Sequence, residues 1–154
     1  MLLAMKVLLF FSLLIGSRWL PGAAGPAKAP GMETATVTVV VTALVSTESV
    51  VKLNFYNAPE KFLKNGQQSL RLVIKPNGKN EISVPVELTK GEWAVALTQD
   101  TNNNGRLDKN FLGIPTEPFA FSNNVRPHLA APNFEECKFM VEGVAKVVNI
   151  TLVQ

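Results

Sequence analysis

The chain has 154 residues, with 15 basic and 12 acidic side chains, one cysteine and one histidine. This length suits a single domain, and an apolar fraction of 47% is typical of a globular protein and excludes wholesale disorder. A single cysteine excludes a disulfide framework within the chain. One cysteine and one histidine also exclude a zinc site of the usual His/Cys type.

The first 24 residues are typical of a secretory signal peptide. Lys6 precedes an apolar run at 7–15, and the small residues Ala23 and Ala24 follow. The alternative is a transmembrane anchor, but an anchor needs about 20 apolar residues to cross the hydrocarbon, and this run is too short. The sequence therefore predicts a periplasmic or secreted protein that has no transmembrane anchor after cleavage.

Cleavage after Ala24, with Ala27 as the second choice, defines the expected organisation of the chain. A signal peptide at 1–24 is followed by a flexible leader at 25–33 and one β-sandwich domain at 34–154. The mature chain keeps 13 basic and 12 acidic side chains. It contains no basic cluster that could follow a phosphate backbone, so we expect no nucleic-acid partner.

Seven segments of the mature chain have the residue pattern of β-strands. In residues 34–45, β-branched side chains dominate and Thr alternates with Ala or Val, which is the period of two expected of a strand. The seven segments are residues 34–45, 50–56, 69–75, 81–88, 92–99, 138–141 and 146–153. They predict an all-β fold, a seven-stranded antiparallel β-sandwich of immunoglobulin-like or prealbumin-like kind.

Turn and edge signals lie between these segments. Asn77-Gly78 accepts positive φ at both central positions of a tight turn, so we expect a turn there. Pro85 has no backbone donor, which places the strand at 81–88 at a sheet edge. Residues 57–66 fit either one helical turn closed by glycine or a plain loop.

The long connection at 100–136 is where we expect function to reside. Connections of this length are uncommon in compact domains and are usually functional or disordered. Disorder is disfavoured because the segment is rich in apolar residues. These residues are Phe111, Leu112, Ile114, Phe119, Phe121, Leu129 and Phe134. We expect an ordered loop that packs them across one end or face of the sandwich.

The start of this connection resembles the first nine positions of an EF-hand-type calcium loop. Side-chain oxygens occupy relative positions 1, 3, 5 and 9, and glycine occupies position 6, where the loop turns sharply. Calcium requires six to eight oxygen ligands at once. The candidate ligands are Asp100, Asn102, Asn104, the carbonyl oxygen of Arg106, and Asp108.

The calcium pattern is incomplete at position 12, where Phe111 replaces the usual bidentate glutamate. Glu117 is the first candidate for the missing carboxylate, and Glu135 or Glu136 come second. The alternative is a metal-free turn, because Asn and Asp readily cap their own backbone. A site with two carboxylates would bind weakly, with a dissociation constant of about 10⁻⁴–10⁻³ M.

Other polar residues give weaker functional signals. His128 has no nucleophile pattern beside it, so we expect a loop histidine and no catalytic residue. Cys137 lies in an apolar stretch without a neighbouring histidine, which predicts a buried inert thiol. The tripeptide 122–124 (Ser-Asn-Asn) fits either a polar pocket or a turn.

Residues 110–124, Asn-Phe-Leu-Gly-Ile-Pro-Thr-Glu-Pro-Phe-Ala-Phe-Ser-Asn-Asn, resemble a family of secreted bacterial proteins catalogued as domain of unknown function 2141. The resemblance extends from about Thr36 to Leu152 and includes the Asp/Asn loop. It implies an exported single-domain β-sandwich with no established activity. The family usually has histidine before the first aspartate of the loop, where this chain has Gln99.

Three functional hypotheses follow from these observations. The first is an exported β-sandwich binding module whose long loop is ordered by Ca²⁺ and presents a surface to a glycan, a peptide or an envelope protein. The second is a metal-free structural or assembly component of the cell envelope. The third is a hydrolase that uses the loop carboxylates and His128, which we do not favour because no nucleophile, base and orienting residue can be assembled from the spacing.

Overall fold

The structure, a computed structural model, describes residues 33–127 and 130–153. The predicted signal peptide at 1–24, the leader residues 25–32, Leu129 and His128 lie outside the described residues. The described residues all belong to the unit Met32–Gln154.

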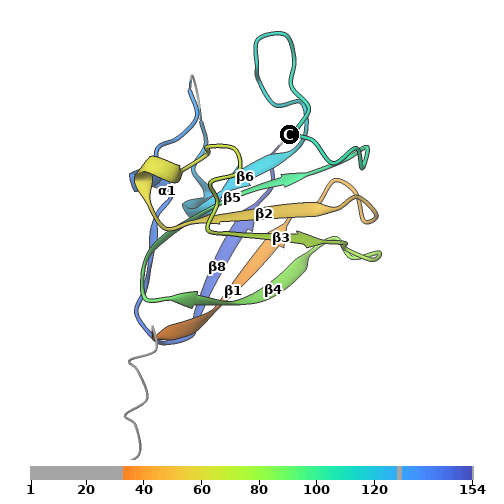
Figure 1. Cartoon of the computed structure of the whole chain (residues 1–154). Helices are drawn as coiled ribbons and strands as arrows, with labels where there is room; N and C mark the ends of the chain where they lie inside the picture. Colours follow the sequence, from red (N-terminus) through yellow and green to blue (C-terminus); the bar gives the residue numbers. More distant parts are fainter. Residues whose placement is uncertain (1–32, 128–129, 154) are drawn as a thin grey trace, which may run out of the picture. The chain divides into compact units, whose positions relative to one another are not determined.

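Within the described residues, eight strands form two sheets (Figure 1). The three-stranded sheet has the order β4 (Ile82–Thr89), β1 (Thr34–Thr42), β8 (Lys146–Thr151). The five-stranded sheet has the order β3 (Leu70–Ile74), β2 (Val51–Tyr56), β5 (Gly91–Gln99), β6 (Phe119–Phe121), and β7 (Phe139–Val141) also pairs with β5. The helical elements are two 3-10 turns, η1 (Pro59–Lys61) and η2 (Ser122–Asn124), and the helix α1 (Phe134–Cys137).

The expected all-β sandwich is confirmed, with two differences in detail. The eighth strand is β6, which has only three residues and is therefore too short to show an alternating pattern. In addition, β8 runs parallel to β1, with Val148 opposite Val39, whereas every other strand pair is antiparallel. The chain enters β8 from β7, in the large sheet, and not through a hairpin with β1.

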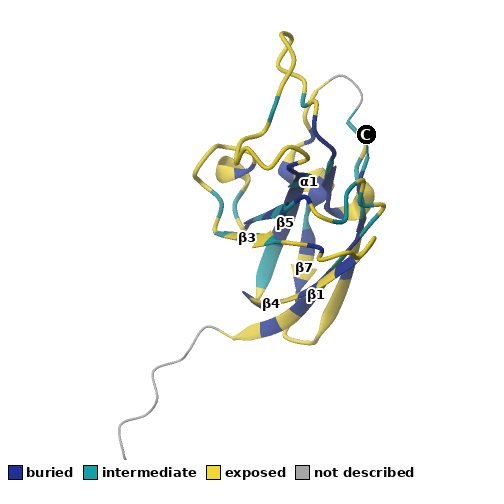
Figure 2. Cartoon of the chain, turned by 90° about the vertical axis from the view of Figure 1, so that its right-hand side faces the viewer, coloured by how far each residue is buried: buried dark blue, intermediate teal, exposed yellow. Residues whose placement is uncertain are grey.

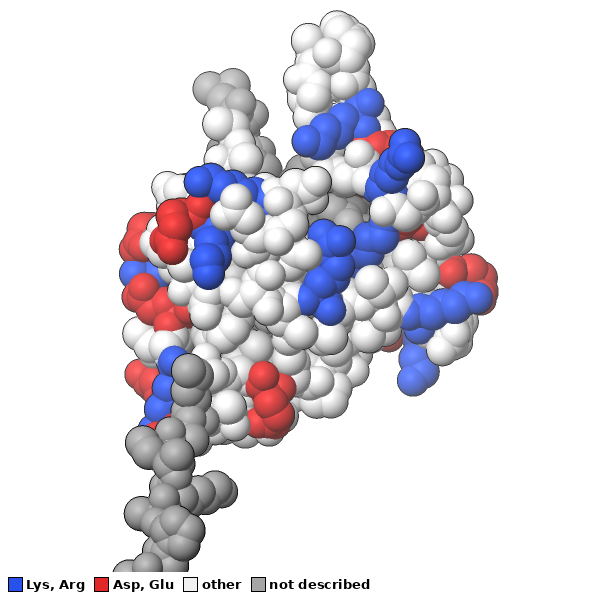
Figure 3. Space-filling view, viewed as in Figure 1, with Lys and Arg blue, Asp and Glu red and all other residues white. Residues whose placement is uncertain are grey.

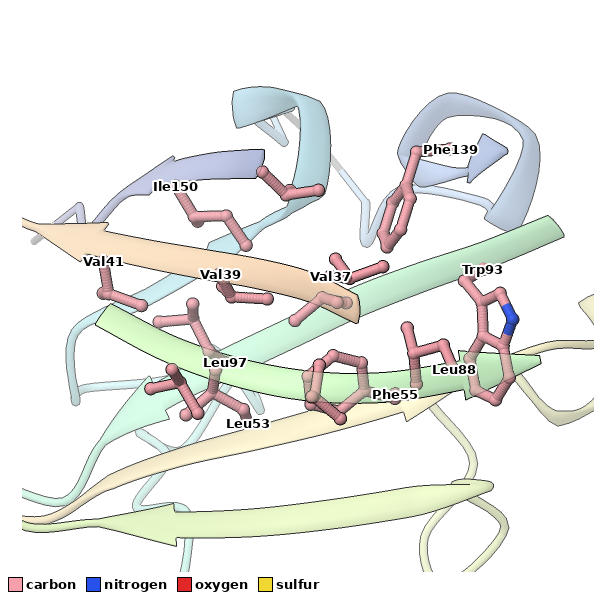
Figure 4. Close-up of a cluster of buried hydrophobic side chains, with 14 of the residues drawn as sticks. Val37, Val39, Val41, Leu53, Phe55, Leu88, Trp93, Leu97, Phe139 and Ile150 are labelled. Atoms are coloured by element: carbon pink, nitrogen blue, oxygen red, sulfur yellow. The ribbon is translucent and has the colours of Figure 1, made fainter. Parts of the chain in front are cut away.

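The core lies between the two sheets. Val37, Val39 and Val41 alternate along β1 and are fully buried, and they face the large sheet, where Leu53 and Leu97 are buried as well (Figure 4). Alternate residues of β1 are partly or fully exposed, so the burial changes along the strand as the sequence alternation predicts (Figure 2).

The local turn and edge predictions agree with the structure. Asn77 and Gly78 both adopt positive φ, at 53° and 82°. β4 is the outer strand of its sheet, so Pro85 has a neighbour on one side only, Thr38 of β1. The missing N–H of the proline therefore removes no hydrogen bond to a second strand. Of the two alternatives for 57–66, the helical turn is present as the short 3-10 turn η1.

A second apolar cluster covers part of the outer face of the large sheet. The ring of Phe62 packs edge-on against Tyr56 and Phe134, with centroid distances of 5.3 and 5.8 Å. Small side chains at Ala94 and Ala96 leave room for these rings on the sheet. The cluster attaches the segments around η1 and α1 to the sheet and leaves the rest of that face open.

The described part of the long connection packs only some of its apolar residues on the sandwich, and the expectation is wrong for the others. Phe119 and Phe121 do pack against the second cluster. Phe111, Leu112 and Ile114 are instead 95%, 67% and 53% exposed. They lie at the tip of a loop that projects from the domain (Figures 1 and 2).

The projecting tip is held by its own backbone. Lys109 and Pro115 form an isolated bridge, and the N–H of Asn110 donates to the carbonyl of Ile114 over 2.9 Å. The N–H of Gly113 donates back to the carbonyl of Asn110 over 2.9 Å. These bonds close a narrow hairpin, whose apolar side chains remain more than half exposed.

Candidate functional site

The Asp/Asn loop begins where β5 ends, and its first residue, Asp100, is buried with 1% exposure. The Asp100 N–H donates to the carbonyl of Val50 over 2.9 Å, which ties the loop to the start of β2. Its Oδ1 accepts from the Asn104 N–H over 3.0 Å, and its Oδ2 accepts from the Gly105 N–H over 2.8 Å. The loop therefore coils around the Asp100 carboxylate, and Gly105, at φ 83°, permits the turn.

Lys52 is a site residue that the sequence reasoning missed. Its Nζ lies 2.6 Å from Asp100 Oδ2, so a buried carboxylate is paired with an ammonium group from β2. The two residues are 48 positions apart in the chain. Alternation along β2 assigns Lys52 to the outer face, but only the register, which pairs Lys52 with Thr98, brings it to the end of β5.

Asp108 closes the other side of the loop. Its carboxylate accepts from the side-chain amide of Asn102 over 2.7 Å and from that of Asn104 over 2.9 Å. The Asn104 Oδ1 in turn accepts from the Arg106 N–H over 2.8 Å. Both asparagines thus connect the backbone of the loop to Asp108.

Glu117, the first candidate for the missing carboxylate, returns to the loop from further along the chain. It is buried with 4% exposure. Its Oε1 accepts from the Thr101 N–H over 3.1 Å, and its Oε2 accepts from the Asp108 N–H over 3.3 Å. The second-choice carboxylates are engaged elsewhere, because Glu136 forms the capping box of α1 and Glu135 pairs with Lys138.

The pKa values of the two buried carboxylates, Asp100 and Glu117, are shifted in opposite directions. Burial raises the pKa of Asp100, but the hydrogen bond and charge of Lys52 and the N–H groups of Gly105 and Asn104 outweigh it, so the pKa lies below its usual value. Burial raises the pKa of Glu117, and the negative charges of Asp100 and Asp108 raise it further. Among the described residues, Lys52 is the one basic side chain within ion-pair distance of these carboxylates.

The structure links all six predicted ligand residues, Asp100, Asn102, Asn104, Arg106, Asp108 and Glu117, in one hydrogen-bond network. Within the described residues, no three histidine, cysteine or carboxylate side chains are grouped closely enough to hold a metal ion. The side-chain amides of Asn102 and Asn104 both donate from Nδ2 to the Asp108 carboxylate. The loop contains oxygen atoms of the kind that Ca²⁺ prefers as ligands. The side-chain amides of Asn102 and Asn104 would have to rotate before their oxygens could bind a central ion.

Gln99 precedes the first aspartate of the loop and is fully buried. Its Oε1 accepts from the Val45 N–H over 2.9 Å, and its Nε2 donates to the Ser46 carbonyl over 2.6 Å. Nε2 also lies 3.3 Å from the Ser49 carbonyl. The amide therefore holds the connection between β1 and β2 against the end of β5.

The side chains of η2 hydrogen-bond to the backbone of neighbouring strands. Of the two alternatives for this tripeptide, the turn therefore explains it and the polar pocket does not. Ser122 is buried, and its Oγ accepts from the Val95 N–H over 2.9 Å. Asn123 and Asn124 adopt positive φ, and Asn124 Oδ1 accepts from the Thr151 N–H over 2.8 Å. This last bond joins the large sheet to β8 in the small sheet.

Cys137 is fully buried, as expected. Burial, with a smaller effect of Glu136, raises the pKa of its thiol to about 12, which keeps it protonated and unreactive.

Within residues 33–127 and 130–153, no helix has the length and apolar character needed to cross a membrane.

Comparison with known proteins places the chain in a family. The family model described as "Uncharacterized protein conserved in bacteria (DUF2141)" matches residues 39–149. Comparisons with curated proteins and with solved structures found no match. The matched segment runs from β1 to β8 and includes the whole Asp/Asn loop and its projecting tip. The chain therefore belongs to the bacterial family DUF2141.

Proposed function

We propose that this protein is an exported binding module and that its projecting loop presents the binding surface. The observation that carries the proposal is the exposure of Phe111, Leu112 and Ile114 at the end of an ordered hairpin. Exposed apolar side chains that cluster in this way mark interaction sites, because burying them against a partner is favourable by about 25 cal/mol per Å². The partner would be a glycan, a peptide or an envelope protein, and the role is binding and not catalysis.

The base of this loop is proposed to bind Ca²⁺, which would stiffen the support of the tip. The proposed ligands are Asp100, Asn102, Asn104, the Arg106 carbonyl, Asp108 and Glu117. Support comes from three carboxylates, Asp100, Asp108 and Glu117, that take part in the hydrogen bonds of one loop, while Lys52 of β2 pairs with Asp100 alone. A divalent cation would offset the remaining repulsion, which otherwise raises the pKa of Glu117.

Thermal melting in calcium and in chelator tests the ion. At 5 mM CaCl₂ and a dissociation constant of 10⁻⁴–10⁻³ M, binding adds about 1–2 kcal/mol to the free energy of unfolding. We expect the melting temperature to rise in CaCl₂ relative to EGTA. Asp108→Asn should remove the rise, whereas the exposed control Glu142→Gln should keep it. An unchanged melting temperature of the wild type would reject the calcium proposal.

The second candidate function is a metal-free structural component of the cell envelope. The observation in its favour is the 2.6 Å pair of Lys52 and Asp100, which gives the loop a cation of its own. In this case Lys52→Met lowers the melting temperature, Lys75→Met at an exposed ion pair does not, and CaCl₂ leaves the wild type unchanged. A calcium-induced rise in the wild type would exclude it.

Export is tested separately by the mass of the protein isolated from the periplasm or the medium of expressing bacteria. We expect a chain that begins at Gly25, after cleavage behind Ala24. Retention in the cytoplasm with an uncleaved N-terminus would contradict export and would leave the calcium test unaffected.

A further inference from the structure

The open part of the large sheet's outer face forms a groove with a volume of about 930 Å³. This lies within the size range of small-molecule sites. One wall comes from the segment after η1, with Leu63 and Gln68, and the opposite wall comes from the projecting loop, with Arg106, Lys109 and Ile114. Figure 3 shows basic side chains gathered around a hollow below the projecting loop.

The floor of the groove follows from strand register. Arg71 on β3 lies opposite Asn54 on β2, Asn54 lies opposite Ala96 on β5, and Ala96 lies opposite Phe121 on β6. One row across the sheet therefore runs from a guanidinium group through a small alanine to an aromatic ring. The small side chain of Ala96 keeps the middle of the floor low, so the face is concave between its cationic and its aromatic sides.

The charge of the groove is positive. Its lining contains Arg71, Arg106 and Lys109, and none of these three forms an ion pair with the described carboxylates. The fourth cation, Lys52, is paired with Asp100. No aspartate or glutamate occurs among the described lining residues.

Arg71 is positioned for an anion. Its Nε donates to the Asn54 Oδ1 over 2.7 Å, which fixes the guanidinium group above the sheet and leaves its remaining N–H groups for a ligand. A guanidinium group held in this way recognises the paired oxygens of a carboxylate or phosphate.

We propose that this groove binds an anionic amphiphile, a molecule with one carboxylate or phosphate group and an apolar body. Arg71, supported by Arg106 and Lys109, would hold the anionic group, and the apolar body would lie on Phe119, Phe121 and Ile114. This site adjoins the proposed calcium loop, with which it shares Arg106, and the exposed tip, with which it shares Ile114, but it requires neither an ion nor a macromolecular partner.

The test is isothermal titration of the purified protein with decanoate and decyl phosphate, both below their micellar concentrations. We expect both to bind, whereas the neutral decyl glucoside and inorganic phosphate bind at least tenfold more weakly, because each lacks one half of the recognised chemistry. Equal binding of decyl glucoside would overturn the role of the charge. Equal binding of inorganic phosphate would overturn the role of the apolar body.

Matched variants locate the site. Arg71→Gln should weaken decanoate binding about tenfold or more, because it removes a charge-assisted contact. Lys79→Gln, an equal loss of charge at an exposed turn, should leave it unchanged. Arg71 is exposed, so its replacement should preserve the melting temperature. Unaltered binding by Arg71→Gln, or sedimentation with anionic vesicles without any binding of free decanoate, would reject the proposal.

Discussion

Gln99 shows how one buried polar side chain determines the path of a connection. Its amide satisfies the N–H of Val45 and the carbonyl of Ser46, two backbone groups that no strand pairs. Buried backbone groups need such partners, because leaving one unpaired costs about 1–3 kcal/mol. An amide supplies both a donor and an acceptor at the end of β5, which suits this position.

Replacing Gln99 with leucine should therefore destabilise the protein by about 2–3 kcal/mol. The side-chain volume is similar, so the loss comes from the unpaired N–H and carbonyl groups. Urea unfolding followed by circular dichroism measures it. Gln67→Leu, at an exposed site, is the control and should stay within about 0.5 kcal/mol of the wild type. Equal stability of both variants would show that water satisfies the two backbone groups.

Cys137 gives a prediction for alkaline pH. The folded thiol keeps its proton up to a pKa of about 12, whereas the thiol of the unfolded chain ionises above about pH 8.5. The unfolded state then binds fewer protons, so stability falls as pH rises from about 9 towards 12 and is independent of this group below pH 8.

The slope from this one thiol is about 1.4 kcal/mol per pH unit. Cys137→Ala should remove that slope from the pH dependence of urea unfolding between pH 9 and 11, whatever its effect on stability at pH 7. Parallel curves for the two proteins would contradict the raised thiol pKa.

At the scale of elements, alternation predicts strands well and contacts between distant segments poorly. All seven alternating segments overlap strands of the structure, because each has one face buried between the sheets. The strand β6 gave no signal because three residues contain too little periodicity. The pairing of Lys52 with Asp100 depends on the register of β2 with β5, which the pattern of either segment alone does not contain.

The five predicted ligand residues within the Asp/Asn loop could be singled out because the spacing of their oxygens is local. The orientation of the apolar tip could not be predicted, because composition favours burial and only the closed hairpin keeps Phe111 away from the sheet. The groove could not be predicted from the sequence either, because its floor combines residues from four strands, Arg71, Asn54, Ala96 and Phe121.

The exposed tip predicts an unequal response of two phenylalanines in the same connection. Phe111→Ser should change the free energy of unfolding by less than about 0.5 kcal/mol, because the ring is 95% exposed. Phe134→Ser should cost about 3–5 kcal/mol, because that ring is buried beside Phe62. Urea titration of both variants checks this. A large loss in Phe111→Ser would show that the tip packs on the domain.

At the scale of the whole molecule, the two sheets depend on the last strand of the chain. β8 contributes Val148 and Ile150 to the core, and Leu152 follows it directly. It also covers one edge of β1, whose other edge pairs with β4. Loss of β8 therefore removes apolar packing and strand pairing together.

Deleting residues 146–154 should leave the protein unfolded. Burial of three aliphatic side chains contributes about 1.5–3 kcal/mol each, which together approaches the 5–15 kcal/mol of a typical domain. Loss of chemical-shift dispersion in the amide NMR spectrum measures the effect. Val147→Ser, on the exposed face of the same strand, should keep the native spectrum. A native spectrum of the truncated chain would show that β4 and β1 suffice.

The position of β1 between β4 and β8 also determines when the molecule can assemble. β1 pairs with β8, which is made much later than β1, so the small sheet cannot be completed before β8 has been synthesised. Until then, one side of a valine-rich strand has unpaired backbone groups that could join another chain. Newly made copies should therefore be most prone to aggregate in this interval, when a chaperone that covers strand edges would help most.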